Sequence, residues 1–262
     1  MPATALFRFA AYGDTRDQHD IHRDVVKTVM TFQPALVLQT GDLVHNGDAE
    51  GEWQIFDEIT HEMRQQIPYY PAQGNHDRGT KGFFENRVTQ PVLSGTKLYY
   101  SFEKENVHFV AIDTEQALDA KSVEGSWLEA DLAKAQAEGR FIIPFFHKAI
   151  FSVGWHAKEK DVMPLRRILQ PLFKQHGVRL VFEGHDHIYY RTVRDGITYI
   201  VTGGGGAPFH PYQHLDLKIP GDVFEEVNHF CVADVLPDCV QVTVYRRDLT
   251  QLDQLTVPTG GQ

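Results

Sequence analysis

The feature that most constrains this chain is a repeated pattern in which a short apolar segment ends at a polar residue. Five predicted strands each lead into Asp, Asn or His, and four of them do so through a glycine that frees the backbone to turn. The strands and the residues after them are Leu6–Tyr12 with Asp14, Ala35–Gln39 with Asp42, Pro68–Ala72 with Asn75-His76-Asp77, Phe141–Phe146 with His147, and Val178–Phe182 with His185-Asp186-His187.

The segments between these strands predict an α/β fold. Ile21–Phe32 and Trp53–Met63 have apolar residues at helical spacing, so the first part of the chain is typical of a βαβαβ unit with parallel strands. Later in the chain, pairs of predicted strands are separated by short turns without a helix between them, and this pattern predicts antiparallel hairpins. We expect hairpins at Leu98–Phe102 with Val107–Asp113, Ile188–Val193 with Ile197–Val201, and Val227–Val235 with Val240–Tyr245, and helices at Gly125–Ala137 and Leu165–Phe173.

The polar strand ends predict a metal site. Ligands of open α/β sheets bind in the crevice outside the carboxyl ends of the strands, so five such ends bring their polar groups together. Carboxylate, amide and imidazole donors without thiolate suit manganese, iron or zinc, and two ions bridged by one carboxylate form a hydrolytic clamp. Taken singly, a Gly-Asp pair is usually a turn and His147 is more often a hydrogen-bonded core histidine; the ordered set favours metal.

Composition is that of a globular protein and excludes some partners. The 262 residues are 42% hydrophobic and 23% charged, and the net charge of -10 argues against binding a nucleic-acid duplex. No stretch approaches the ~20 apolar residues of a membrane span. The N-terminal apolar stretch is too short and too soon interrupted to be a signal peptide, so we expect a cytoplasmic protein. We expect residues 1–262 to form a single domain.

Two sequence details concern the C-terminal half. Cys231 and Cys239 flank a predicted turn at Pro237-Asp238. If Asp234 pairs with Cys239, Cys231 falls opposite Val242, so a disulfide between the cysteines is disfavoured. The glycine run 203–206 directly follows a strand and predicts a tight loop in close contact with another part of the chain.

The ordered motifs resemble those of the calcineurin-like metallophosphoesterases. The likeness runs from about residue 6 to 206, and the segment GHDHIYYRTVRDGITYIVTGGGGAPF is most similar to the purple acid phosphatase branch. The resemblance implies an αββα four-layer sandwich, with two mixed β-sheets flanked by helices, and a dinuclear metal centre. It rests on Gly13-Asp14, Gly41-Asp42, Gly74-Asn75-His76-Asp77, His147 and Gly184-His185-Asp186-His187.

The resemblance also implies a role for each motif residue. Asp42 would bridge the two ions, and the remaining ligands would be Asp14 and His187 for the first ion and Asn75, His147 and His185 for the second. His76 would stabilise the phosphate or donate a proton, oriented by Asp77. His156, nine residues after His147, would face the substrate.

The sequence departs from the family pattern at the first metal. Most members have a histidine two residues after the first aspartate, but this chain has Arg16. The purple branch has a tyrosine three residues after the bridging aspartate, and here that position is His45, which would restore the missing imidazole. His19, His22 or water are alternative donors, with His22 expected to be solvated. Arg16 would then be free to bind a phosphate oxygen.

These features predict a phosphoric ester hydrolase with two divalent or mixed-valence ions. The resemblance implies in-line attack on phosphorus by a metal-held hydroxide, with a small phosphate ester as substrate and a phosphomonoester favoured. A phosphodiesterase acting on nucleotides or lipid head groups is the alternative. A catalytically silent metal-binding scaffold is a rival, disfavoured because His76 and Asp77 persist beside the ligands. Substrate choice is expected in the loops Lys81–Thr96, Ser152–Asp161 and Pro208–Val223.

Overall fold

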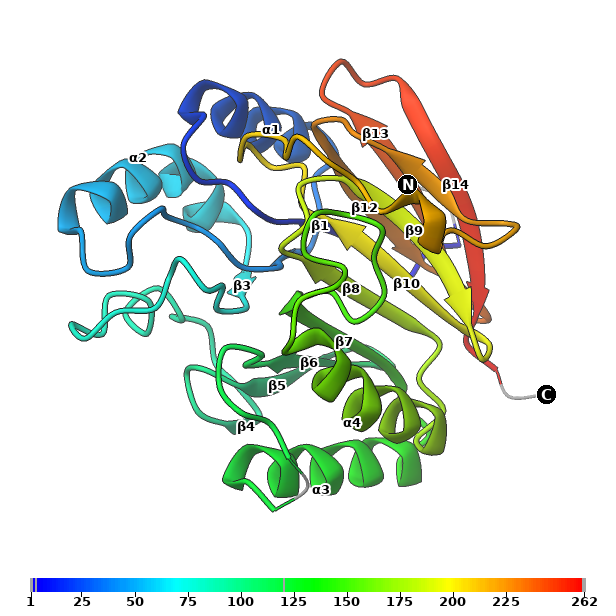
Figure 1. The fold of residues 1–262 in the computed structure, drawn as a ribbon. Coiled ribbons are helices and arrows are strands. Elements are labelled where there is room, and N and C mark those ends of the chain that lie inside the picture. The colour runs from blue at the N-terminus through cyan, green and yellow to red at the C-terminus, as the bar shows by residue number, and fades with distance from the viewer. Residues whose placement is uncertain (1, 3, 120, 261–262) are drawn as a thin grey trace.

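Two mixed β-sheets with helices beside them make up the fold. The computed structural model describes residues 2, 4–119 and 121–260. Figure 1 shows helices α1 and α2 beside the first sheet and α3 and α4 beside the second. The arrangement confirms the predicted αββα sandwich. In the described part of the chain, no helix is both long and apolar enough to cross a membrane.

The first sheet combines the N-terminal parallel strands with a C-terminal antiparallel meander. Strand β1 pairs in parallel with β2 and antiparallel with β12. In sheet order the strands are β14 (Gln251–Pro258), β13 (Cys239–Arg246), β12 (His229–Val235), β1 (Phe7–Tyr12), β2 (Leu36–Gln39) and β3 (Tyr69–Pro71).

The second sheet has parallel strands at its centre and antiparallel strands at both edges. In sheet order its strands are β11 (Val223–Glu225), β9 (Tyr189–Arg194), β10 (Ile197–Thr202), β8 (Leu180–Gly184), β7 (Phe141–Lys148), β6 (Val107–Ile112), β5 (Tyr100–Lys104) and β4 (Ser94–Gly95).

The helices follow the apolar periodicity read from the sequence. Val25, Val26 and Val29 form the buried side of α1, and Leu165, Leu169 and Phe173 form that of α4. The described helices are α1 (His19–Thr31), α2 (Glu50–Gln66), α3 (Val123–Ala137) and α4 (Val162–Gln175), with one 3₁₀ turn, η1 (Leu215–Leu217).

Aromatic side chains join the two sheets. The ring of Phe9, on β1, meets the edges of Phe109 on β6 and Phe182 on β8, with centroid distances of 5.4 and 5.8 Å. All three side chains are fully buried. Edge-to-face pairs add to the free energy gained from apolar burial, so this cluster fixes one sheet against the other.

Two sequence expectations need correction, and one is confirmed. Strand β14 (Gln251–Pro258) was not predicted, because it is an edge strand whose exposed residues alternate weakly. The register of β12 against β13 is shifted by two residues from the expected one, since Asp234 pairs with Gln241 and Cys231 therefore lies opposite Val244. Both cysteines are free thiols, as the disfavoured disulfide implies.

Removing the aromatic contact between the sheets should destabilise the fold. We expect Phe9→Ala to lower the free energy of unfolding by about 3–5 kcal/mol, because a large cavity opens in a closely packed core. Leu6→Ala is the matched control, since Leu6 is 45% exposed and its loss should change stability by less than about 0.5 kcal/mol. Urea denaturation measures both, and equal effects of the two substitutions would contradict the assignment.

Candidate metal centre

The five polar strand ends meet between the two sheets. Asp42 follows β2 of the first sheet, and its Oδ1 lies 3.3 Å from Nε2 of His147, on β7 of the second. The same His147 nitrogen lies 3.0 Å from Oδ1 of Asn75, which follows β3. The backbone N–H of His185, at the end of β8, donates to both carboxylate oxygens of Asp14, after β1. The site therefore draws on the strand ends of two sheets, not one.

Three of these residues have left-handed backbone conformations. Asp14, Asp42 and His185 have φ values of 56°, 57° and 72°. Such angles are uncommon for residues other than glycine, and they cluster at functional sites, where the surrounding structure holds them. The unusual backbone conformation is therefore adopted by the site residues themselves, and it directs their side chains into the crevice.

The preceding glycines serve mainly close packing. Only Gly41 among the four has a left-handed φ, of 99°. A Cβ on Gly74 would lie 2.2 Å from the backbone nitrogen of Asp42, and a Cβ on Gly203 would lie 2.2 Å from the carbonyl oxygen of Asp186. The expectation that the glycines free the turn thus needs correction for three of the four, whereas the close approach predicted for residues 203–206 is confirmed.

His147 presents one defined nitrogen to the crevice. It lies at an irregularity in the pairing of β7 with β8, between Phe146 and Lys148, and such bulges redirect side chains. Its Nδ1–H donates to the carbonyl of Thr40 at 2.9 Å, so Nε2 carries the lone pair. Burial lowers its pKa to about 3, so the ring is neutral near pH 7.

His187 is held in the same way. Its Nδ1–H donates to the carbonyl of Pro208 at 2.5 Å, and its Nε2 lies 3.6 Å from Oδ1 of Asp14. Burial lowers its pKa to about 3. A neutral imidazole whose second nitrogen is occupied by a carbonyl is the form in which histidine binds metals.

His185 completes a group of acceptor atoms. Its Nε2–H donates to Oε2 of Glu159 at 3.1 Å, which leaves the lone pair on Nδ1, 3.0 Å from Nε2 of His147. The imidazole nitrogens of His147 and His185 therefore face each other beside the oxygens of Asn75 and Asp42. Lone pairs repel at these distances unless a cation lies among them, so the donor set fits a metal ion.

The buried carboxylates also require positive charge. Asp14 and Asp42 are at most 1% exposed, and burial together with the Asp42 charge raises the pKa of Asp14 well above its usual value. Burial would raise the pKa of Asp42 too, but the nearby imidazoles, His147 foremost, lower it to about 2. Ligand atoms of Asp14, Asp42 and His147 lie within 4.8 Å of one another. Buried carboxylates at such spacing are normally paired or bound to metal.

His76 and Asp77 are placed differently from expectation. The Asp77 carboxylate accepts backbone N–H groups from Leu43 at 2.7 Å, Val44 at 3.1 Å and Gly74 at 2.8 Å. It fixes the two loops that carry Asp42 and Asn75, rather than orienting the His76 ring. The ring is oriented by the His45 carbonyl, which accepts its Nδ1–H at 2.7 Å, and the His76 backbone N–H donates to Asp42 Oδ1.

The residues expected to compensate at the first metal contact other side chains in this structure. Nδ1 of His45 is 3.0 Å from Oδ1 of Asp17, and its side chain is 57% exposed, so its role as a ligand stays a prediction. Arg16 donates from Nε to Asp42 Oδ2 at 3.2 Å and also pairs with Asp17. His22 is buried on α1 and stacks on Phe56, which corrects the expectation that it is solvated.

Sequence reasoning missed two residues at this site. His156, the predicted substrate-facing residue, donates its Nδ1–H to Oε1 of Glu159 at 2.6 Å, and its Nε2 lies 3.3 Å from Nε2 of His210. The His210 ring in turn stacks on His187, with centroids 4.3 Å apart. Glu159 and His210 lie in the loops 152–161 and 208–223, where no strand-end pattern marks them.

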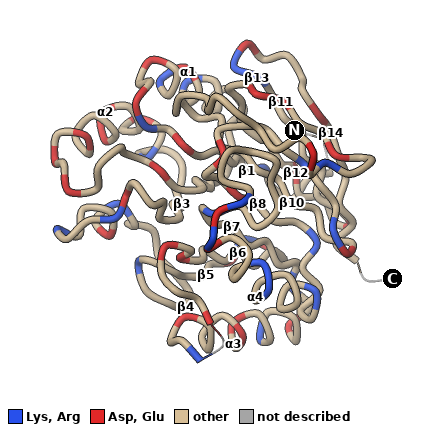
Figure 2. The backbone as a smooth tube through the Cα atoms, in the orientation of Figure 1, with Lys and Arg blue, Asp and Glu red and all other residues tan. Residues whose placement is uncertain are grey.

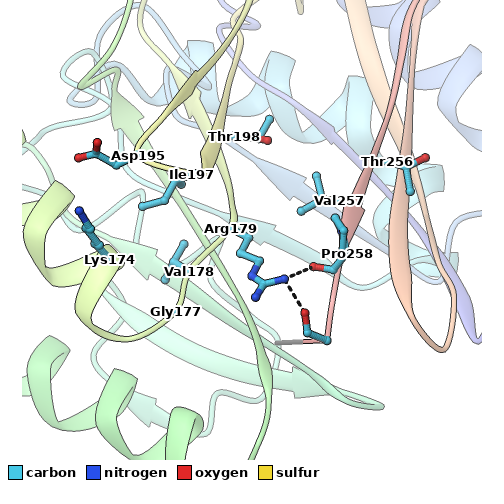
Figure 3. A pocket seen from close by; sticks show the side chains of 12 residues that line it. Lys174, Gly177, Val178, Arg179, Asp195, Ile197, Thr198, Thr256, Val257 and Pro258 are labelled. Atoms are coloured by element: carbon cyan, nitrogen blue, oxygen red, sulfur yellow. Dashed lines mark hydrogen bonds between the residues drawn. The ribbon is translucent and has the colours of Figure 1, made fainter. Parts of the chain in front are cut away.

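A cavity of the described residues lies away from these strand ends. It measures about 580 Å³ and lies between β10, β14 and the connection from α4 to β8. The Arg179 guanidinium donates to the carbonyls of Pro258 and Gly260 at 3.3 and 2.5 Å. Figure 3 shows this side chain reaching toward Pro258. None of the strand-end residues above lines this cavity, so it is not the predicted site.

The chain belongs to the calcineurin-like phosphoesterase family, whose model matches residues 7–189. Purple acid phosphatase 18 of Arabidopsis thaliana is 31% identical over 225 residues, which cover 78% of this chain and 51% of that protein. This chain therefore spans about half the length of that relative.

Two solved structures share the fold. A purple acid phosphatase from yellow lupin (Lupinus luteus) seeds has a TM-score of 0.77 and 18% identity, covering 96% of this chain and 53% of its own. GAP50, the anchor in the inner membrane complex of Plasmodium, has a TM-score of 0.74 and 16% identity, covering 98% of this chain and 90% of its own.

The contacts of Asp77 predict that this residue acts through the backbone. Asp77→Ala leaves three buried N–H groups without an acceptor, and each such group costs about 1–3 kcal/mol. We expect a clear loss of unfolding free energy in denaturant. His76→Ala, at the neighbouring position, keeps the backbone bond to Asp42 and should change stability far less. Comparable stability of the two variants would show that the Asp77 contacts do not hold these loops.

Proposed function

We propose that this chain hydrolyses phosphate esters, with phosphomonoesters as its preferred substrates and two metal ions as cofactors. The observation that carries the proposal is the convergence of four acceptor atoms, from His147, His185, Asn75 and Asp42, none of which carries a proton to donate to the others. The relationship to purple acid phosphatases supports the same activity.

Two groups of ligands are proposed. Asp42 would contact both ions, because its Oδ1 faces His147 and its Oδ2 faces Arg16, toward the loop of Asp14. Asp14 and His187 would hold the first ion with Asp42, and Asn75, His147 and His185 would hold the second. When bound, such ions supply Lewis-acid polarisation of phosphoryl oxygens and lower the pKa of water. Manganese, iron and zinc suit these oxygen and imidazole donors.

Other side chains would handle the substrate. The His76 ring lies close enough to Asp42 to lower its pKa, and its Nε2 remains available when Nδ1–H is bound to His45. We assign the His76 ring a role in stabilising the phosphate or in donating a proton to the leaving group. Arg16 stands beside Asp42 and would turn its guanidinium to a phosphate oxygen once a metal neutralises that carboxylate. His156 would contact the ester from the opposite loop.

The charge distribution makes these local cations important. Figure 2 shows acidic and basic residues interspersed along the helices and loops, and the chain as a whole carries a charge of -10. An anionic substrate is therefore attracted by the centre itself rather than by the whole protein, because screening limits distant charges to about 8–10 Å.

Hydrolysis of two chromogenic esters tests the proposed activity. Purified protein with added Mn²⁺ should release p-nitrophenol from p-nitrophenyl phosphate faster than from bis-p-nitrophenyl phosphate. Strong chelator should abolish turnover, and Asp42→Ala should lose both metal and activity. His76→Ala should retain metal but lower kcat by about 10²-fold, the scale of acid–base catalysis.

The opposite outcomes are equally specific. Faster release from the diester would favour the phosphodiesterase alternative. Absence of turnover of both esters, with two ions bound, would favour a silent scaffold. Full activity of Asp42→Ala in chelator would exclude a metal mechanism.

The residue at position 45 predicts the colour of the protein. A tyrosine there would give a phenolate–iron(III) bond with strong visible absorption, but this chain has His45. We expect a colourless or pale protein that is active with divalent ions and has no ferric requirement. His45→Ala should weaken the first ion selectively if the imidazole leaves Asp17 to bind it. An intense visible band in the iron-loaded protein would contradict the predicted colour, and unchanged metal affinity in His45→Ala would remove this residue from the ligand set.

A further inference from the structure

Glu159 links two histidines that come from different parts of the chain. Its Oε1 accepts the Nδ1–H of His156 at 2.6 Å, and its Oε2 accepts the Nε2–H of His185 at 3.1 Å. The two imidazole rings stack, with centroids 3.9 Å apart and planes inclined by 30°. One carboxylate therefore holds a pair of stacked rings by a nitrogen of each.

The position of Glu159 is itself constrained. It lies in the loop 152–161, where the backbone N–H of His156 donates to Oδ1 of Asp186 at 2.8 Å. A Cβ on Gly154 would lie 2.1 Å from the Asp186 carboxyl carbon, so this loop packs directly on the segment that carries His185. The Glu159 side chain is 39% exposed, which leaves its carboxylate partly solvated.

The contact decides which nitrogen of His185 carries the proton. A neutral imidazole has one N–H and one lone pair, and the hydrogen bond made by one nitrogen selects the other as a ligand. With Nε2–H committed to Glu159, the Nδ1 lone pair faces His147 Nε2 at 3.0 Å. In the other tautomer, Nδ1–H would donate to His147 and occupy the space that a cation needs.

We propose that Glu159 is a positioning residue of the metal centre, which fixes His185 in the tautomer that binds the second ion and ties the His156 loop to it. The inference rests on the metal centre of the proposed function. It goes beyond that function because Glu159 is no part of the strand-end ligand set. Carboxylates that orient metal-binding histidines typically contribute 10–100-fold to metal affinity.

The test compares Glu159→Gln with a matched variant. Glutamine keeps the size of the side chain but cannot accept a hydrogen bond from both rings. The control is Glu129→Gln, because Glu129 Oε1 accepts from His176 Nε2 at the same distance, 3.1 Å, in the α3–α4 region. Glu159→Asp keeps the negative charge, so it should retain part of the metal affinity that Glu159→Gln loses.

Two measurements on metal-free protein provide the readouts. Competition with a chromophoric chelator gives stepwise Zn²⁺ affinities, without any substrate. We expect two ions in the wild type, one of them bound about 10–100-fold more weakly in Glu159→Gln, and no change in Glu129→Gln. In ¹⁵N-histidine NMR spectra of the wild type, His185 should be in the Nε2–H tautomer.

Several results would overturn the proposal. Unchanged affinities in Glu159→Gln would do so, as would equal weakening of both ions. Loss of a third, separate ion would instead make Glu159, His156 and His185 a cation site of their own, since their ligand atoms lie within 4.8 Å of one another. If Glu159→Gln does not fold, or if the wild type binds no Zn²⁺, the NMR spectrum of the wild type tests the proposal. Observation of the Nδ1–H tautomer of His185 would then refute it. Ester hydrolysis is assayed separately, so failure of the proposed activity remains distinguishable.

Discussion

The electrostatic constraint on this structure is a buried group of acceptor atoms with too little positive charge. The imidazoles of His147 and His187 are neutral because burial lowers their pKa values, and their Nδ1–H groups are already committed to backbone carbonyls. Asp14 and Asp42 add buried carboxylates to the same space, where Arg16 is the nearest cation of the described residues. Such a group is unfavourable without a cation and strongly favourable with one.

Both sheets are needed to form this group of acceptor atoms. Aromatic packing of Phe9 against Phe109 and Phe182 fixes the sheets face to face, and this brings the end of β2 next to the end of β7. The bulge at His147 then directs its ring into the site, and the Asp77 carboxylate holds the loop that carries Asp42. The positive φ values of Asp14 and Asp42 are maintained by these surroundings.

The sequence predicts the ligands better than it predicts their partners. Asp42 and His147 are recognisable because each directly follows an apolar strand, and strand ends converge by rule. Glu159 follows no such rule, because its contact depends on how one irregular loop packs against β8. The sequence also does not predict that the His76 ring binds the carbonyl of His45. Every residue has a backbone carbonyl, so the residue type does not indicate such a partner. The sequence does not predict edge strand β14, because its apolar and polar residues do not alternate clearly.

The most direct test of the central claim is a crystal structure of the protein loaded with Mn²⁺, with the ions located by anomalous scattering. The account predicts two ions about 3.5–4 Å apart, both in contact with Asp42, with the ring nitrogens of His147 and His185 on the same ion. A single ion bound elsewhere, or two ions of which neither touches Asp42, would contradict it.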